Sequence, residues 1–252
     1  MIDLHTHILP RLDDGARTLA ESVSMARAAA ADGIRILAAT PHVRSDYPTS
    51  ASEMERGVAE LREALTAEGI ALELRTGGEI ALEQLPLLDD EELARFGLAA
   101  NPNYLLLEFP YYSWPLSLRS QVIDLRGRGI TAVVAHPERN AEVQSAPERI
   151  AEIVEQGALV QLTSASVEGR LGRASRRTAF RLLELGLAHL IASDAHAPQV
   201  RAVGMSAAAK ALGNRELARW LAEDVPAAIV ADAPTPARPA FRRRRLFRFS
   251  VG

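Results

Sequence analysis

The sequence predicts an α/β fold in which seven strands form a closed or distorted (β/α) barrel. Short β-like runs alternate with helical patterns along the chain, and this alternation is typical of right-handed β-α-β units. The β-like runs are apolar on both faces, as expected for buried parallel strands. Because no Gly-x-Gly-x-x-Gly or Walker sequence follows any of these runs, a dinucleotide- or nucleotide-binding fold is disfavoured.

The predicted strands are short apolar runs, and helical patterns fill the gaps between them. The strands are expected at 2–5, 34–39, 71–76, 104–109, 131–135, 159–163 and 189–193. Two helices are expected to begin at capping-box spacings, Thr18 to Glu21 and Ser52 to Glu55. The helices are expected at 18–32, 52–69, 89–96, 117 to 127 or 129, 147–157, 175–186 and 214–231, the last broken near Pro226.

The composition excludes several classes of protein. With 252 residues, of which 48% are hydrophobic, the chain can form one large barrel or two small domains. The absence of cysteine excludes disulfides, thiolate catalysis and cysteine-ligated zinc. The chain begins with no basic stretch before an apolar one, and no run approaches the roughly 18 apolar residues of a membrane span. We therefore expect a cytoplasmic protein.

Charge divides the chain into an acidic body, 1–232, and a basic tail, 233–252, which we expect to be flexible. The tail holds six of the 29 basic residues and no acid, which leaves the body with 23 basic against 32 acidic residues. An acidic body argues against nucleic-acid binding as the main task. The tail begins as a Pro-rich linker. Its segment 241–249 mixes arginine with aromatic residues, which suits an anionic membrane surface at the inner face of the membrane. Docking on a neighbouring subunit and simple disorder are the alternatives.

Histidines and acidic residues follow the predicted strands, at the end where the active sites of such barrels lie. His189 is the exception among the six histidines, since it precedes apolar residues inside a strand, and we interpret it as structural. His5 and His7 are two residues apart, so their side chains share one face of an extended strand. Neutral imidazole and carboxylate are ligands for divalent transition metals. The candidate metal ligands are His5, His7, Asp14, His42, Glu79, Glu108, His136, Asp194 and His196.

Nine ligands are too many for one ion and indicate two or three ions with a bridging carboxylate. Neighbouring divalent ions support the hydrolysis of phosphate esters. Without metal, the four ligand carboxylates would repel a phosphate. Arg139 and Arg201 lie close to candidate ligands in the sequence, and arginine holds phosphate oxygens bidentately. The alternative for Arg139 is a surface ion pair with Glu138 or Glu142.

These motifs together resemble the PHP (polymerase and histidinol phosphatase) superfamily. Within it they are most similar to the bacterial manganese-dependent protein-tyrosine phosphatases of capsule and exopolysaccharide loci. The resemblance covers residues 1 to about 230. It depends on His5-Thr6-His7, Leu12-Asp13-Asp14-Gly15, Ala39-Thr40-Pro41-His42, Gly77-Gly78-Glu79, Leu107-Glu108, Ala135-His136-Pro137-Glu138-Arg139 and Ala192-Ser193-Asp194-Ala195-His196.

The resemblance implies a distorted (β/α)7 TIM-like barrel, the PHP fold, with a trinuclear site at the C-terminal ends of the strands. It favours Asp14 over Asp13 as a ligand. In the implied arrangement, His5, His7, Glu79 and Asp194 hold the first ion, Glu79 bridges to a second held by Glu108 and His136, and Asp14, His42 and His196 hold the third. The implied catalytic residues are Arg139 and Arg201, which bind the phosphate, together with His42 and His196.

The resemblance also implies a reaction and a partner. A metal-bridging hydroxide would attack phosphorus in line and release phosphate from the phosphotyrosine-bearing tail of a bacterial tyrosine kinase. Two or three Mn²⁺ ions are expected, and a site of histidine and carboxylate also accepts Fe²⁺, Co²⁺ or Zn²⁺. The alternatives are a small-molecule phosphatase with a substrate like histidinol phosphate and a non-catalytic metal-binding module.

Three further features bear on the substrate. Many relatives have a second histidine where this chain has Val43, and an asparagine where it has Ala197. Neither position belongs to the ligand set, so we expect the differences to affect the rim of the site. The aromatic residues that follow Glu108 either belong to the core or line a pocket for a phenyl ring; they are Tyr111, Tyr112 and Trp114.

Overall fold

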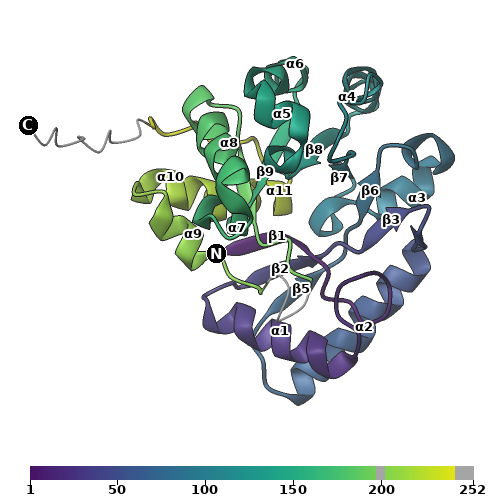
Figure 1. Cartoon of the computed structure of the whole chain (residues 1–252). Helices are drawn as coiled ribbons and strands as arrows, with labels where there is room; N and C mark the ends of the chain where they lie inside the picture. The colour runs from purple at the N-terminus through teal and green to yellow at the C-terminus, as the bar shows by residue number, and fades with distance from the viewer. Residues whose placement is uncertain (197–201, 242–252) are drawn as a thin grey trace, which may run out of the picture.

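The computed structural model describes residues 1–196 and 202–241, and its strands form two sheets (Figure 1). The first sheet has the order β1-β2-β5, with β1 at Ile2–Thr6, β2 at Ile36–Ala39 and β5 at Glu73–Arg75. The second has the order β10-β9-β8-β7-β6-β3-β4. Its strands are β3 (His42–Arg44), β4 (Tyr47–Pro48), β6 (Glu79–Ala81), β7 (Tyr104–Glu108), β8 (Thr131–Ala135), β9 (Leu159–Thr163) and β10 (Leu190–Ala192).

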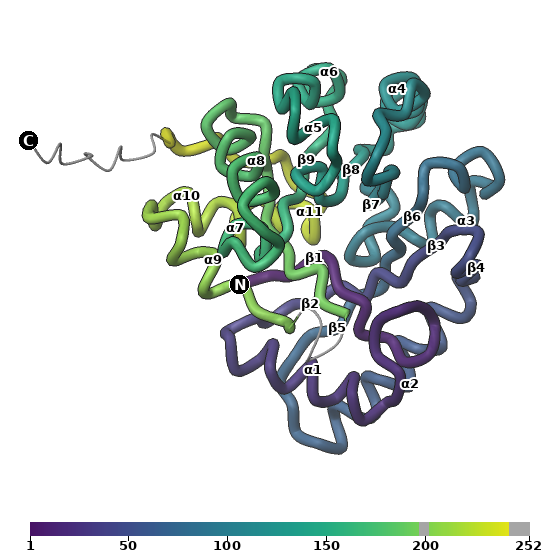
Figure 2. The backbone as a smooth tube through the Cα atoms, in the orientation of Figure 1, coloured from purple at the N-terminus to yellow at the C-terminus, as the bar shows by residue number. Residues whose placement is uncertain are grey.

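The two sheets are parts of one distorted barrel. Strand β2 continues into β3, and β5 into β6, so each pair is one bent strand that contributes to both sheets (Figure 2). Pro41 lies at the first bend, where its missing N–H interrupts the ladder. On the other side, an isolated parallel bridge pairs Thr6 with Ala195, which connects β1 to the chain that follows β10. The predicted α/β barrel fold is confirmed, with strand pairing that is interrupted instead of continuous.

Helices cover the outside of the strands (Figure 1). Short 3-10 turns occupy Leu85–Leu87, Leu98–Ala100, Pro137–Arg139 and Pro147–Ile150, and a π-helical turn, η5, occupies Trp220–Asp224. No helix among residues 1–196 and 202–241 is long and apolar enough to cross a membrane. The α-helices are α1 (Leu19–Ala31), α2 (Ala51–Ala67), α3 (Asp90–Arg95), α4 (Leu118–Gly127), α5 (Ala141–Ser145), α6 (Ala151–Val154), α7 (Ser164–Glu168), α8 (Gly172–Leu185), α9 (Ser206–Ala211), α10 (Arg215–Arg219) and α11 (Val225–Val230).

All seven predicted strands are present, but the start of α2 was predicted wrongly. The capping box is formed by Ser50 and not by Ser52: Ser50 Oγ accepts from Glu53 N, and the Glu53 carboxylate accepts from Ser50 N. Ser50 and Ser52 each have a glutamate three residues later, and only the backbone shows which of the two serines lies outside the helix. Strands β3, β4 and β6 were not predicted, because they are two or three residues long.

The start of the basic tail packs on the body, contrary to the expectation of a flexible linker from residue 233. Trp220 Nε1 donates to Pro236 O at 3.0 Å, and an Arg238 guanidinium nitrogen donates to Leu183 O at 2.6 Å. Phe241 packs against the core. These contacts satisfy polar groups that a free linker would leave to water. Residues 242–252, and with them most of the predicted membrane segment 241–249, lie outside the described residues.

Candidate metal centre

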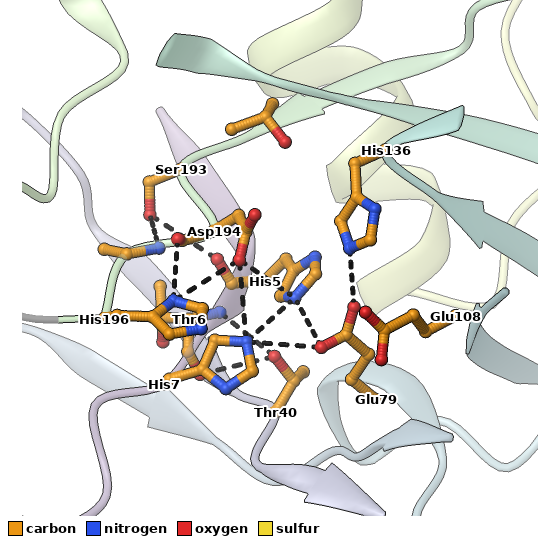
Figure 3. A network of polar contacts seen from close by, with 12 residues as sticks. His5, Thr6, His7, Thr40, Glu79, Glu108, His136, Ser193, Asp194 and His196 are labelled. Atoms are coloured by element: carbon orange, nitrogen blue, oxygen red, sulfur yellow. Dashed lines mark hydrogen bonds and ion pairs between the residues drawn. The ribbon is translucent and has the colours of Figure 1, made fainter. Parts of the chain in front are cut away.

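Strand β1 and the residue that follows it direct His5 and His7 to the same point. Thr6 lies between them and fixes the strand to β2, since its Oγ1 donates to Ala38 O at 2.7 Å. Alternation along the strand then places both imidazoles on the opposite side. The two Nε2 atoms are 3.2 Å apart, and both side chains are fully buried (Figure 3). Two ring nitrogens this close can be joined by one cation.

The loop after β1 gives its two aspartates different roles. The Asp14 Oδ1 lies 3.5 Å from His42 Nε2 and 3.2 Å from His196 Nε2, and the carboxylate is half exposed. Asp13 is instead a hydrogen-bonding residue, whose Oδ2 lies 2.7 Å from His7 Nδ1. Gly15 permits this loop, because a Cβ at that position would lie 2.0 Å from His7 O. The preference for Asp14 as the ligand is consistent with this geometry and stays a prediction.

Glu79 is the centre of the cluster. Its Oε1 lies 2.8 Å from His136 Nε2, and its Oε2 lies 3.3 Å from the Nε2 atoms of both His5 and His7 (Figure 3). The Oε2 is also 2.9 Å from His42 Nδ1, and neither of these two buried atoms has a hydrogen-bond partner. Buried polar atoms without a hydrogen bond are costly in a folded protein, and a bound cation would satisfy both.

Two further predicted ligands come from positions with strained backbone. His136 has φ +36° and Asp194 has φ +51°, both in the left-handed region that most residues avoid. Strain of this kind is concentrated at functional sites.

Two of the predicted carboxylate ligands lie near histidines of the cluster. The Asp194 Oδ1 lies 3.7 Å from His5 Nε2, and the Glu108 Oε2 lies 3.5 Å from His42 Nδ1.

All nine predicted ligands converge on one site, in four overlapping groups. Within each group the ligand atoms lie within 4.8 Å of one another. His136 and Glu108, which the resemblance assigns to one ion, fall into different groups that share Glu79, so the division among ions stays a prediction. Among the described residues, His189 belongs to none of the groups. The groups are His7, Asp14, His42 and His196; His5, Glu79 and His136; His5, His7 and Asp194; His42, Glu79 and Glu108.

The electrostatics of the cluster show an excess of negative charge. Burial alone would lower the pKa of His7, but Asp13 and Glu79 raise it well above its usual value. Burial, together with Glu79, raises the pKa of Glu108 to about 7. Burial lowers the pKa of His136 to about 4, which keeps that imidazole neutral. Protons held by His7 and Glu108 thus offset charge that divalent cations would offset more strongly.

The predicted phosphate-binding arginines have different outcomes. Arg139 lies at the cluster, where its NH1 donates to Asp194 Oδ2 at 2.7 Å, so it doesn't form the surface pair with Glu138 or Glu142 that was the alternative. Its guanidinium carbon lies 4.5 Å from the centre of the Tyr111 ring. Arg201, like Ala197, lies outside the described residues.

Sequence reasoning missed two residues that contact the ligands. Gln161 Oε1 lies 3.0 Å from His5 Nδ1, and Arg44 NH1 donates to Glu108 Oε2 at 3.4 Å. Gln161 lies within a buried apolar strand, where a lone polar residue was a usable signal. Arg44 gave no signal in the sequence, because arginine is a common residue on protein surfaces.

The chain is similar to capsule-synthesis phosphatases over most of its length. A family model described as "Capsular polysaccharide synthesis, CpsB/CapC" matches residues 1–233. The tyrosine-protein phosphatase YwqE of Bacillus subtilis is 38% identical over 204 residues, which are 80% of this chain and 79% of that protein. The tyrosine-protein phosphatase CpsB of Streptococcus pneumoniae is 28% identical over 92% of this chain and 99% of that protein.

A solved structure is also similar. It belongs to a set described as crystal structures of YwqE from Bacillus subtilis and CpsB from Streptococcus pneumoniae, unique metal-dependent tyrosine phosphatases. The TM-score is 0.86 at 34% identity, and the match covers 96% of this chain and 100% of the other.

Proposed function

This chain belongs to the CpsB/CapC family of capsular polysaccharide synthesis, and we propose that it is a metal-dependent tyrosine-protein phosphatase. The observation that carries the proposal is the convergence of five imidazoles and four carboxylates within overlapping groups whose atoms lie within 4.8 Å. No cysteine is present, so a phosphocysteine intermediate is excluded. The names of the relatives support a phosphotyrosine substrate, which the ligand geometry alone does not specify.

The ligand set fits two or three divalent ions. The buried Glu79 and His42 atoms that lack a hydrogen bond support this fit, as does the mixture of neutral imidazole and carboxylate without thiolate. Bound ions would generate the nucleophile from water at neutral pH and offset the negative charge of the phosphate. We propose Mn²⁺ as the metal, with Fe²⁺, Co²⁺ or Zn²⁺ as chemically acceptable substitutes.

The residues of the chain would bind and orient the phosphate. Asp194 holds the Arg139 guanidinium at the edge of the cluster, with a nitrogen-to-oxygen distance of 2.7 Å. A guanidinium fixed in this way can still present its other N–H groups to phosphate oxygens. The ring of Tyr111 supports the guanidinium from one side. We propose that Arg201 is a second phosphate ligand, together with His42 and His196 as active-site residues.

The finer proposal concerns the partner and the cellular location. We propose that the substrate is a phosphotyrosine segment of a bacterial tyrosine kinase that regulates capsule synthesis, and that the enzyme acts in the cytoplasm. The basic residues of segment 241–249 support contact between that segment and an anionic membrane. Liposome sedimentation tests this contact: full-length protein should bind anionic vesicles better than a chain that ends at Asp232, and equal binding would refute it.

A substrate comparison tests the activity. The purified protein is loaded with Mn²⁺ and given a phosphotyrosine peptide, a phosphoserine peptide and histidinol phosphate. We expect metal-dependent turnover of the phosphotyrosine peptide above the other two. Preferred turnover of histidinol phosphate would favour a small-molecule phosphatase. Absence of any metal-dependent turnover would favour a non-catalytic metal-binding module and end the proposal.

A further inference from the structure

A cavity of about 460 Å³ opens directly beside the metal cluster. The carboxylate of Glu108, which belongs to one of the ligand groups, lines it. The cavity has the volume of a small-molecule site. Its lining residues come from the ends of β3, β6 and β7 and the loops that follow these strands.

The cavity is deep, because it extends from an exposed rim to a buried floor. Ser45, Asp46 and Glu83 at the rim are exposed. Ala81 and Glu108 are each only 6% exposed, so they lie at the floor. A phosphate that reaches the metal cluster through this cavity must therefore be attached to a side chain that spans the distance from the rim to the floor. The side chain of phosphoserine is several bonds shorter than that of phosphotyrosine.

The walls of the cavity suit a flat aromatic group. The carbon side chains of Ala81, Phe109 and Pro110 and the ring of Tyr111 supply apolar surface. The Tyr111 ring is itself fixed, since it lies 5.6 Å from the His136 ring and under the Arg139 guanidinium. Rigid apolar surface of this kind favours an aromatic ligand over a flexible polar one.

Arg44 provides a cationic wall at the same cavity. Its Nε and NH2 donate to the two carboxylate oxygens of Asp46, at 2.6 and 3.0 Å, which holds the guanidinium in one plane. NH1 reaches down to Glu108 at 3.4 Å. A guanidinium held flat at a cavity wall can stack on the face of an aromatic ring.

From these observations we propose that this cavity is the subsite for the aromatic ring of the phosphorylated tyrosine, with Ala81 as its floor and Arg44 as a specificity-determining residue. This inference depends on the proposed phosphatase function. The subsite would select aryl over alkyl phosphate esters through depth and ring stacking. The metal cluster and Arg139 would bind the phosphate of either class.

Binding of two phosphonates tests the subsite without turnover. Titration calorimetry on the Mn²⁺-loaded protein compares phenylphosphonate with methylphosphonate, which share the phosphate mimic and differ in the ring. We expect the wild type to bind phenylphosphonate at least about tenfold more tightly. Ala81→Leu fills the floor and should reduce that ratio to about twofold or less while methylphosphonate binds as before. Equal ratios in the wild type and the variant would overturn the proposal.

A second variant keeps the test decisive if Ala81→Leu does not fold. Arg44→Ala removes a partly exposed side chain and should weaken phenylphosphonate binding about threefold more than it weakens methylphosphonate binding. Arg75→Ala is the matched control. Arg75 pairs with a carboxylate two residues away, as Arg44 does, and has a similar exposure, 34% against 32%, but lies outside the cavity lining. An equal effect of the two arginine variants would overturn the role of Arg44.

Failure of the subsite proposal can be distinguished from failure of the phosphatase proposal. If the wild type hydrolyses phosphotyrosine but shows no preference for phenylphosphonate, only the subsite fails. If the wild type hydrolyses no phosphoester, the phosphatase proposal fails, and the subsite proposal, which depends on it, fails with it even where the phosphonates bind differently.

Discussion

The Asp13 carboxylate and the His7 imidazole form a buried pair, with 2.7 Å between Oδ2 and Nδ1. The same Oδ2 accepts from His42 N at 3.0 Å, so one carboxylate orients two predicted metal ligands without belonging to a ligand group. Carboxylates that hold a ligand imidazole in this way fix its tautomer and its direction. Asp13 therefore connects the loop after β1 to the start of β3.

We predict that Asp13→Ala weakens metal binding about 10- to 100-fold, because His7 loses its orienting partner. Competition with a chromophoric chelator measures the affinity for Mn²⁺. Asp124→Ala is the control, since Asp124 is an exposed aspartate on α4 whose ion pair with Arg128 is only a surface contact. Unchanged affinity in Asp13→Ala would show that His7 is oriented by its packing alone.

His136→Ala should abolish phosphatase activity while the barrel stays folded. The side chain contacts Glu79 at 2.8 Å and belongs to one ligand group, so its loss opens the shell around Glu79. Activity assays and thermal unfolding by circular dichroism measure the two effects. The control is His189→Ala, because His189 lies in none of the ligand groups among the described residues. Retained activity in His136→Ala would remove this residue from the site.

Metal removal should inactivate and destabilise the protein together. Chelation leaves Glu79 among buried imidazoles whose protons replace the cations only in part. A ligand that binds only the folded state also raises the unfolding temperature by mass action. We expect EDTA to remove activity and lower the unfolding temperature, and Mn²⁺ to restore both. Full activity after exhaustive dialysis against EDTA would contradict a metal-dependent mechanism.

Arg139→Lys should reduce kcat/KM by at least about tenfold, because lysine cannot bind phosphate bidentately while it pairs with Asp194. Steady-state kinetics with a phosphotyrosine peptide measures the loss. Arg149→Lys is a matched control: Arg149 also pairs with a carboxylate, that of Glu142, and also lies over an aromatic ring, that of Trp114 at 4.8 Å. Similar losses in both variants would indicate a general effect of losing a guanidinium.

His189 should make the fold less stable in acid. Burial, with repulsion from Arg238, lowers the pKa of His189 to about 4, and its Nδ1 accepts from Val160 N at 3.1 Å. Below a pH of about 6.5 the unfolded chain binds a proton at this residue that the folded chain rejects until about pH 4, so stability is lost as the pH falls through that range. The loss should approach about 3 kcal/mol at pH 4.

Urea unfolding of the wild type and of His189→Gln, between pH 7 and pH 4, measures this dependence. Glutamine can still accept from Val160 N but does not titrate, so the variant should lose less stability in acid. Parallel pH profiles for the two proteins would show that His189 is not the residue responsible.

The sequence was sufficient to predict the alternation of strands and helices and the identity of nine candidate ligands. Apolar runs of four to six residues and the His-x-His and Asp-x-His spacings are local patterns, which the chain carries without reference to its fold. The same reasoning kept His189 apart, because that residue lies inside a strand pattern, and His189 joins no ligand group among the described residues. Strands as short as β3 and β6 carry too few residues for such a pattern.

Only the tertiary structure decided which ligands share a group, which aspartate orients His7, and that Arg44 reaches Glu108. It also decided that residues 236–241 pack on Trp220 and α8 instead of forming a free linker. These distances join residues far apart in the sequence, such as His5 and Asp194, and are set by the register of parallel strands and by the bends between β2 and β3 and between β5 and β6. A local sequence pattern contains no information on such distances, because they result from the packing of the whole barrel.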